Sequence, residues 1–451
     1  MKNRRIRNLG VCLGALFLVI VMSISACTPP ATPPSGEGEW GPPIKVGIMG
    51  AMKIAPGQDF WKGASLAAEE INAAGGVVVA GVPREFEVVK YDTNEFASIP
   101  DAVNTMEYAI TRGKVEFLIG ANRSEAVLAM MEIMAEYKVP WLNAPSAPQT
   151  VGKVADDYDK YKYFFRVGTV GVDPLSRGAL STTWMAWDKL SKEIGVDKPN
   201  VALLCEKTLG ATYVIDLYQA AHEKAGWPIV GRWEVGALAT DVTAEMSAIK
   251  ASGAHIINYM LSGPSGIPYG KAYGELEVPA LSIGCNQEAM KTTYWEATGG
   301  YCNYDTTIEM IGPCGLSDKT LPFWNNYMAQ GSDWGYPGFS SAVGYDSMYI
   351  YKDAIERAGT TEADAVVEAL EETNWTGVMG QLTFTSNHDT PYGPDACKNI
   401  SAQWQNGELV PVWPRDWKGY PWEDVWWDKP VTLDGTVEFM IPPRTLEHFS
   451  K

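Results

Sequence analysis

Short β-rich runs alternate with longer helical runs along most of this chain, and this alternation constrains the fold more than any other feature. The first cycles predict strands at residues 44–49, 86–91, 115–119 and 139–143, and helices at 60–72, 100–111 and 124–137. Repeated strand–helix units build a parallel sheet with helices on both faces, because each crossover helix returns the next strand to the same direction. This part of the sequence therefore predicts one α/β lobe.

The same rhythm restarts after a strand predicted at residues 163–167. Further strands are expected at 201–205, 229–235, 255–260 and 278–283, with helices at 211–224, 242–251 and 265–276. The second sheet is similar in size to the first, so the predicted fold class is α/β with two doubly wound parallel-sheet lobes. Ligands bind beyond the carboxyl ends of such strands, so we expect a site in the cleft between the lobes.

The C-terminal hundred residues change character. After helices expected at 340–358 and 362–373, hairpin strands are predicted at 381–384, 400–404 and 409–413, with a turn at Asn406-Gly407. Six tryptophans then crowd a short region: Trp404, Trp413, Trp417, Trp422, Trp426 and Trp427. Aromatic rings can stack sugars, but tryptophans in a loop-rich segment more often pack it onto a lobe, and we favour packing.

The N-terminal segment has the pattern of an export signal. A basic head precedes an apolar run at residues 11–24, which is too short to span a membrane stably. The run ends in Ile24-Ser25-Ala26-Cys27, which resembles the bacterial lipobox, where the cysteine thiol receives a diacylglycerol. We therefore predict a lipoprotein signal peptide at 1–26 and lipidation of Cys27.

Residues 27–43 are rich in Pro, Gly, Ser and Glu, and this composition predicts a flexible tether. An ordinary secretory signal that happens to contain Cys27 is the alternative, but a tether is expected behind an anchor. A second acyl chain would make attachment to the membrane stable. The expected location is thus a cell-membrane-anchored lipoprotein that faces the periplasm or the cell exterior.

The charge of the chain argues against two classes of partner. The whole sequence has a net charge of −18, and loss of the basic leader would move it to about −22. Such an acidic protein is a poor match for nucleic acid or for an anionic bilayer face. We expect no nucleic-acid partner and contact with the membrane only through the anchor.

Five cysteines remain besides Cys27 in the mature chain: Cys205, Cys285, Cys302, Cys314 and Cys397. They contain no CxxC pair, so we expect no metal site. In an oxidising compartment Cys302 and Cys314 are the most plausible bridge, although two free buried thiols fit the sequence equally well.

Several motifs follow one another in a recognisable order. They are Gly63-Ala64, Ala68-Glu69-Glu70-Ile71-Asn72-Ala73-Ala74-Gly75-Gly76, Val89-Lys90-Tyr91-Asp92, Phe117-Leu118-Ile119-Gly120, Val139-Pro140-Trp141-Leu142-Asn143-Ala144-Pro145-Ser146, Gly344-Tyr345-Asp346 and Ala354-Ile355-Glu356-Arg357-Ala358-Gly359. This ordered set resembles the type I periplasmic solute-binding proteins of the branched-chain amino acid and amide uptake systems. The resemblance runs from about residue 44 to about residue 414.

The resemblance implies two lobes joined by a three-strand hinge that close on a ligand. Crossings are expected near residues 166–169, 308–313 and 375–382. Lobe one would then comprise 44–166 plus 314–375, and lobe two 167–313 plus 376–451. The implied function is that of a monomeric, extracytoplasmic substrate-binding lipoprotein of an ABC importer. Its partners would be ABC permease subunits and a small molecule: an amino acid, an amide or a small carboxylate.

In relatives that bind amino acids, lobe one holds the ligand carboxylate with a hydroxyl and backbone N–H groups at a helix start. The matching positions are Arg123 and Ser124, before and at the start of the Met-rich helix, and Ser146 and Ala147 in the next strand loop. A helix N-terminus offers unpaired donors and partial positive charge to an anion. The sequence leaves two alternatives open, in which Ser124 is a plain N-cap and Arg123 is a solvated side chain.

Lobe two departs from the family pattern. Amino acid binders place an acidic residue after the fourth strand of this lobe, where it pairs with the ligand ammonium, and here Asn286 and Gln287 stand instead. A buried ammonium without a carboxylate is costly, so a standard α-amino acid is in doubt. Glu206 is a possible substitute from a neighbouring strand end. Tyr259 stands at the end of another strand and completes the expected set.

Enzyme activity is not expected. The chain contains no GxSxG, HExxH or GxGxxG motif, and its four histidines lie too far apart in sequence to form a triad or metal set. We therefore expect no catalytic residues, no cofactor and no metal. A ligand-sensing receptor lipoprotein is the first alternative, and a secreted hydrolase on the same scaffold is the second.

Overall fold

Two mainly parallel β-sheets organise the structure, and each forms the centre of one lobe. The computed structural model describes residues 40–331, 335–393, 395–416 and 431–450, all within one unit. The predicted leader, Cys27, most of the tether and four of the six clustered tryptophans (Trp417, Trp422, Trp426 and Trp427) lie outside the described residues.

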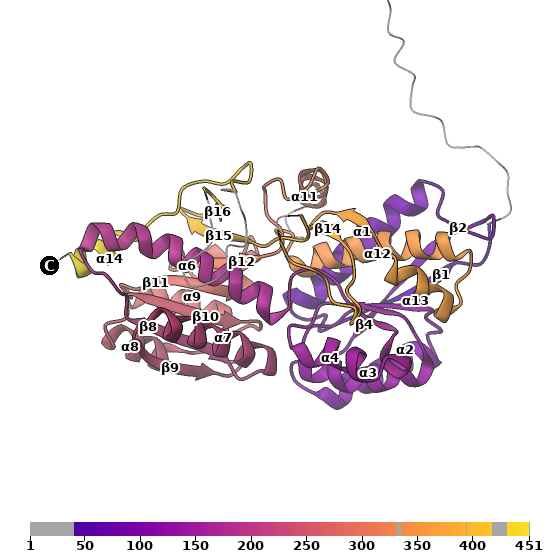
Figure 1. The fold of residues 1–451 in the computed structure, drawn as a ribbon, viewed down its shortest axis with the longest axis horizontal. Helices are drawn as coiled ribbons and strands as arrows, with labels where there is room; N and C mark the ends of the chain where they lie inside the picture. Colours follow the sequence, from indigo (N-terminus) through magenta and orange to yellow (C-terminus); the bar gives the residue numbers. More distant parts are fainter. Residues whose placement is uncertain (1–39, 332–334, 394, 417–430, 451) are drawn as a thin grey trace, which may run out of the picture. The chain divides into compact units, whose positions relative to one another are not determined.

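The sheet of lobe one is entirely parallel. Its strand order is β4 (Phe86–Asp92), β1 (Ile44–Gly50), β5 (Phe117–Gly120), β6 (Trp141–Asn143) and β7 (Phe164–Arg166). Around it lie α1 (Ala55–Ala73), α2 (Ile99–Thr111), α3 (Ser124–Tyr137), α4 (Pro148–Asp156), α5 (Tyr158–Tyr161), α11 (Thr320–Ala329), α12 (Phe339–Ala358) and α13 (Ala363–Glu371). Figure 1 shows α12 and α13, from late in the chain, beside α1 and β1 from its start.

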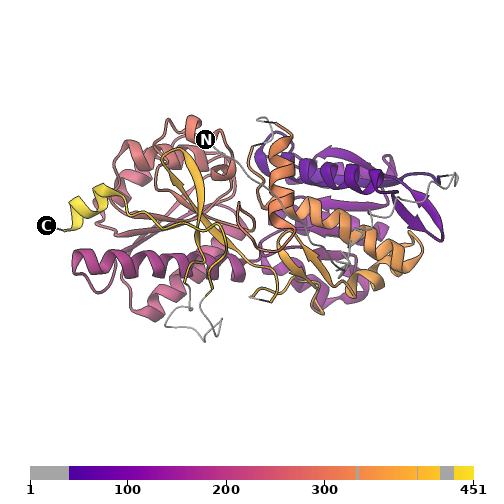
Figure 2. The ribbon, with the colours of Figure 1, turned by 90° about the horizontal axis from the view of Figure 1, so that it is seen from above.

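The sheet of lobe two is parallel with an antiparallel edge. Its order is β16 (Glu408–Trp413), β15 (Ile400–Gln405), β12 (Thr306–Glu309), β11 (Leu281–Asn286), β10 (Ile256–Leu261), β8 (Val201–Glu206) and β9 (Ile229–Val235). The pairings of β15 with β12 and with β16 are antiparallel, and the other pairings are parallel. Its helices are α6 (Val172–Ile194), α7 (Leu209–Ala225), α8 (Thr243–Ala251), α9 (Gly266–Glu275), η1 (Gln287–Met290), α10 (Tyr294–Ala297) and α14 (Pro443–Phe449). Figure 2 shows the two lobes from above.

The parallel strands of both lobes follow the same order, in which the second strand lies outside the first and the next three follow on the other side. The point at which this order reverses leaves a crevice beyond the carboxyl ends of the strands. The structure thus confirms the predicted α/β fold class with two doubly wound lobes. Two small hairpins, β2 (Val77–Val79) with β3 (Val82–Arg84) and β13 (Trp375–Gly377) with β14 (Gly380–Leu382), complete the set.

Several elements differ from the sequence-based expectation, and two of them belong to the core of lobe two. The 23-residue helix α6 was not predicted, because Pro174, Gly178 and the Ser181-Thr182-Thr183 run have low helix propensity. Its core-facing residues are nevertheless buried, so tertiary packing stabilises it. Strand β11 begins at Leu281, three residues later than predicted, and ends at Asn286.

Lobe one continues beyond the predicted boundary at residue 375. The hydroxyl of Ser317 donates to Gly377 O at 2.7 Å, and that of Thr320 donates to Val378 O at 2.8 Å, so the β13–β14 hairpin is fixed to lobe one. Further along, Arg166 Nε donates to Asp389 Oδ1 at 2.7 Å. The chain enters the sheet of lobe two at Ile400, so the third crossing lies between these points and not at 375–382.

The structure shows the state of the five described cysteines and the packing of two of the clustered tryptophans. All five described cysteines are free and buried, so Cys302 and Cys314 follow the free-thiol alternative. Trp404 and Trp413 are each 1% exposed, and Trp404 Nε1 donates to Ala289 O at 2.9 Å. These two tryptophans pack β15 and β16 onto lobe two, as the packing interpretation predicts.

A buried carboxyl group in α12 makes the stability of lobe one depend on pH. Asp346 is 1% exposed and accepts hydrogen bonds from Val378 N at 3.0 Å. Burial raises the pKa of this carboxyl to about 7. Between pH 4 and 7 the folded protein therefore holds a proton that the unfolded chain has lost, and its stability falls as the pH rises.

The variant Asp346→Asn should lose this pH dependence, because an amide does not titrate. We expect the free energy of unfolding of the variant, minus that of the wild type, to increase from pH 5 to pH 8. Urea denaturation across this range measures the difference, with the exposed Asp156→Asn as a control that should stay level. If the difference between Asp346→Asn and the wild type also stayed constant from pH 5 to pH 8, the raised pKa of Asp346 would be contradicted.

Candidate functional site

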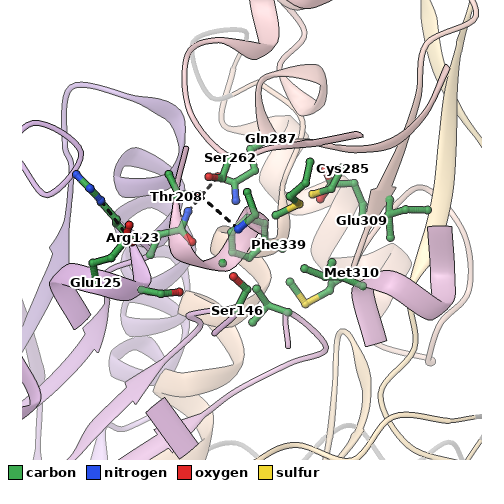
Figure 3. Close-up of a pocket in the computed structure, with 18 residues that line it drawn as sticks. Arg123, Glu125, Ser146, Thr208, Ser262, Cys285, Gln287, Glu309, Met310 and Phe339 are labelled. Carbon is green, nitrogen blue, oxygen red and sulfur yellow. Dashed lines mark hydrogen bonds and ion pairs between the residues drawn. The ribbon is translucent and has the colours of Figure 1, made fainter. Parts of the chain in front are cut away.

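A pocket lies between the two lobes at the carboxyl ends of their strands. Its lining is divided between lobe one, lobe two and the connecting segments, and consists of Asn122, Arg123, Ser124, Glu125, Ser146, Val170, Leu175, Thr208, Gly210, Ala211, Met260, Ser262, Cys285, Gln287, Ile308, Glu309, Met310 and Phe339. Figure 3 shows Arg123 and Glu125 on one side of it and Cys285, Glu309 and Met310 on the other. Both lobes and the hinge region thus contribute to one site.

Two serines of lobe one meet at this pocket. Ser124 is the first residue of α3, and its hydroxyl accepts a hydrogen bond from Ala147 N at 3.1 Å. Ser124 therefore joins α3 to the loop after β6. Arg123, the N-cap residue of α3, makes no side-chain cap hydrogen bond to the helix. Ser146 lies in that loop, lines the pocket and is 8% exposed. Two hydroxyls and the first turn of a helix thus converge at the pocket.

Arg123 is held by its own lobe. Its Nη1 donates to Glu95 O at 3.3 Å and to Phe96 O at 3.0 Å, and its Nε lies 3.5 Å from Glu125 Oε2. The buried Glu95 carboxylate accepts from Asn122 N at 2.8 Å and from Arg123 N at 3.3 Å. Glu95 therefore already occupies the donors that precede α3, which leaves Ser124, Ser146 and the N–H groups of the first helical turn for an anion.

Hydrogen bonds cross the pocket from one lobe to the other. Asn122 Nδ2 donates to Gln287 Oε1 at 3.0 Å, and Leu209 N, at the start of α7, donates to Glu125 Oε1 at 3.0 Å. Gly210 lies so close to lobe one that a Cβ at this position would be 2.0 Å from Ser146 Oγ. The lobes are thus in direct contact, which is the arrangement expected of a closed binding protein.

Glu206, Tyr259 and Asn286 do not line this pocket. The Glu206 carboxylate accepts from Ser262 Oγ at 2.8 Å and Gly263 N at 2.7 Å. Tyr259 donates to Asp305 Oδ1 at 2.8 Å. Asn286 Nδ2 donates to Gly266 O at 3.2 Å and to the Tyr294 hydroxyl at 2.9 Å. All three are fully buried and bonded within lobe two.

The alternation of side chains along a strand explains this placement. Successive residues of a strand face opposite sides of the sheet, so a position chosen one residue away faces the wrong side. Glu206, Tyr259 and Asn286 share the face covered by α8 and α9, whereas Met260 and Cys285 share the face that leads to the pocket. Gln287, just beyond β11, is the predicted lobe-two residue that does line the pocket.

The sequence-based reasoning missed Glu309. It is the last residue of β12, is 2% exposed and lines the pocket between Ile308 and Met310. Burial raises the pKa of its carboxyl well above the ordinary value. An acidic residue at the end of a buried strand, inside a predicted crossing, was the signal available in the sequence.

Within the described residues, no helix is long and apolar enough to cross a membrane. No group of three His, Cys, Asp or Glu side chains in the same part of the chain is arranged to hold a metal ion. The pocket lining contains hydroxyl, amide, carboxylate and apolar groups, which suit a small organic molecule.

Comparison with known proteins places the chain among solute-binding proteins. A family model described as periplasmic binding protein matches residues 43–396. A leucine binding protein from Thermotoga maritima MSB8 is 20% identical, with a TM-score of 0.66 over 82% of this chain and 97% of that one. A branched-chain amino acid transporter substrate binding protein from Streptococcus pneumoniae, in complex with isoleucine, is 20% identical with a TM-score of 0.66 over 81% and 97%.

A third similar structure has a different kind of ligand. It is a solute binding protein of an ABC transporter from R. palustris in complex with benzoate, 14% identical, with a TM-score of 0.67 over 89% of this chain and 99% of that one. At these identities the likeness concerns the fold. The two ligands named for these structures, isoleucine and benzoate, share a carboxylate and differ in that only isoleucine has an ammonium group.

Proposed function

The chain belongs to the periplasmic binding protein family, and on this premise we propose that it is the extracytoplasmic substrate-binding lipoprotein of an ABC importer. Membership confirms the family that the ordered motifs predicted. The proposed role is to capture an amino acid, an amide or a related small carboxylate and to deliver it to ABC permease subunits. Lipidation at Cys27 would keep the protein at the membrane.

The observation that carries this proposal is the pocket between the two lobes, in which polar groups of lobe one converge. Ser124 and Ser146 offer hydroxyl donors beside the first turn of α3, where a carboxylate is favoured by unpaired N–H groups and partial positive charge. The lining also contains Met260, Ile308 and Phe339, which suit an apolar ligand body. A carboxylate with an apolar body is common to isoleucine and benzoate.

We propose that the ligand docks first on lobe one and that lobe two then closes over it. Contacts made only in the closed form set the balance between open and closed states, since a ligand shifts an equilibrium only by its differential affinity. Polar residues of lobe two that line the pocket, among them Thr208, Ser262 and Gln287, take the place that the sequence-based expectation gave to Tyr259 and Asn286.

A thermal-shift screen tests the proposal. Residues 38–451, with and without an N-terminal anchor, are heated with α-amino acids, their amides and aromatic acids. A ligand that binds only the native state should raise the melting temperature, by an amount that grows with its concentration. Chemical turnover of a compound that binds would contradict the proposal and favour the hydrolase alternative.

Ser146→Ala tests the position of the ligand within the pocket. Loss of a hydroxyl that donates to a ligand oxygen should weaken binding by about 1–3 kcal/mol, because the buried ligand oxygen is left without a partner. Isothermal titration calorimetry with a compound from the screen measures the change. The control is Ser191→Ala on α6, whose hydroxyl donates to Asp188 O. Equal affinity of both variants and the wild type would remove Ser146 from the site.

A further inference from the structure

Glu309 is a buried carboxylate that no cation of the described chain neutralises. Its side chain is 2% exposed, and the described residues contain no ion pair with it. The hydroxyl of Thr307 lies 3.4 Å from its Oε1, which is a long contact, and the backbone of Phe339 provides a second donor. Burying an ionised carboxylate with so few partners is costly.

Other buried carboxylates in the same region are satisfied. Glu206 accepts from Ser262, Gly263 and Ser265 at 2.8 Å or less. Asp305 accepts from the hydroxyls of Tyr259, Ser282 and Tyr294 at 2.7–3.0 Å. Each thus has three close donors supplied by the protein, whereas Glu309 has one long contact and one backbone donor and faces a pocket.

A second acidic side chain, Asp59, lies near Glu309, and its negative charge makes the local environment more favourable for a cation. A smaller cavity adjoins the pocket and is lined by Asp59, Gln287, Glu309 and Phe339 among others. Burial raises the pKa of Asp59 to about 7, and repulsion from Asp59 also raises the pKa of Glu309. Lys62 and Lys291 lie near enough to Asp59 to lower its pKa, although the net shift of Asp59 is upward.

We propose that Glu309 binds an ammonium or similar cationic group of the ligand, so that the transported molecule carries both a carboxylate and a cation. This inference rests on the proposed function and names the class of substrate. The hinge strand β12 would then supply the acid that we expected after β11, where Asn286 stands. The doubt about α-amino acids that Asn286 raised is thereby removed.

The arrangement also gives the ligand an orientation. Its carboxylate would bind at Ser124 and Ser146 of lobe one, and its cation would bind at Glu309 on the connecting segment. Neither end would depend on the buried polar face of lobe two that contains Tyr259 and Asn286. Figure 3 shows Ser146 and Glu309 as separate parts of the pocket lining.

Calorimetry with matched pairs of compounds tests the proposal. Each pair contains an amino acid and the same acid without its amine: leucine with 4-methylpentanoate, and phenylalanine with 3-phenylpropanoate. Benzoate and 4-hydroxybenzoate are added as acids without a cation. The wild type is compared with Glu309→Gln, which keeps the shape and removes the charge. Glu288→Gln is the control, since Glu288 is also buried but pairs with Lys291 at 2.9 Å.

We expect the wild type to bind at least one amino acid more than about tenfold more tightly than its deaminated partner, which corresponds to about 1.4 kcal/mol. Glu309→Gln should remove most of that difference, and Glu288→Gln should retain it. Melting curves of each variant show whether it is folded.

Two different outcomes would overturn the proposal, and they differ in whether the proposed function also fails. Tight binding of an acid without a cation, with affinity retained in Glu309→Gln, would mean that a protonated Glu309 donates to the ligand, and the proposed function would stand. Binding of none of the compounds, by a folded wild type, would contradict the proposed function and this inference together.

Discussion

Gly210→Ala is expected to weaken ligand binding by roughly 1–3 kcal/mol, which is about fivefold to 150-fold, while both lobes stay folded. A Cβ at position 210 would lie 2.0 Å from Ser146 Oγ and 3.3 Å from Ser124 Oγ. The overlap exists only when α7 lies against lobe one, so the cost falls on the closed form alone. Relief by rotation of Ser146 would turn its hydroxyl away from its present position beside the ligand site.

The matched control is Gly152→Ala, which makes the same change in α4, where a Cβ would meet no atom within 4 Å. Calorimetry with a compound from the screen should show wild-type affinity for this control. If Gly210→Ala bound the compound as tightly as Gly152→Ala does, closure would not require the close approach of α7 to Ser146, and the proposed site would be misplaced.

The second large effect concerns stability. Gly63→Ala should lower the free energy of unfolding by about 1–3 kcal/mol or more, because a Cβ on α1 would lie 2.0 Å from Ser341 O on α12. Gly344 approaches α1 in the same way, with a Cβ position 2.5 Å from Phe60 O. The obstructing atoms are backbone carbonyl oxygens, so no side-chain rotation relieves the overlap and the two helices must move apart.

Chemical denaturation of the two glycine variants separates this effect from helix propensity. Gly152→Ala should be neutral or more stable by up to about 1 kcal/mol, since alanine is the better helix former. Gly63→Ala benefits from the same propensity and should still be less stable than the wild type. A stability equal to that of Gly152→Ala would contradict the close packing of α1 against α12.

Much of the fold follows from the sequence because local pattern and tertiary packing agree. The predicted helix at 124–137 has the observed bounds, and the turn at Asn406-Gly407 has the positive φ angles that such a hairpin needs. Helix α6 could not be predicted in this way, because its Gly, Pro, Ser and Thr content opposes helix formation locally and only burial in lobe two stabilises it.

The candidate site was predictable in lobe one and much less so in lobe two. Ser124 and Ser146 are placed by a helix start and a strand end, and both signals are local. In lobe two the choice between Tyr259 and Met260 depends on which face of a strand meets the cleft, and a shift of one residue reverses it. Glu309 lies in a connecting strand, so its exposure to the pocket depends on the meeting of two lobes far apart in sequence.

The central claim is that a small molecule closes the two lobes over the pocket, and small-angle X-ray scattering in solution tests it most directly. The account predicts that a saturating compound from the thermal-shift screen lowers the radius of gyration of the wild type and lowers it less in Gly210→Ala. A radius of gyration that stays unchanged in the wild type, with binding shown by calorimetry under the same conditions, would contradict closure on the ligand.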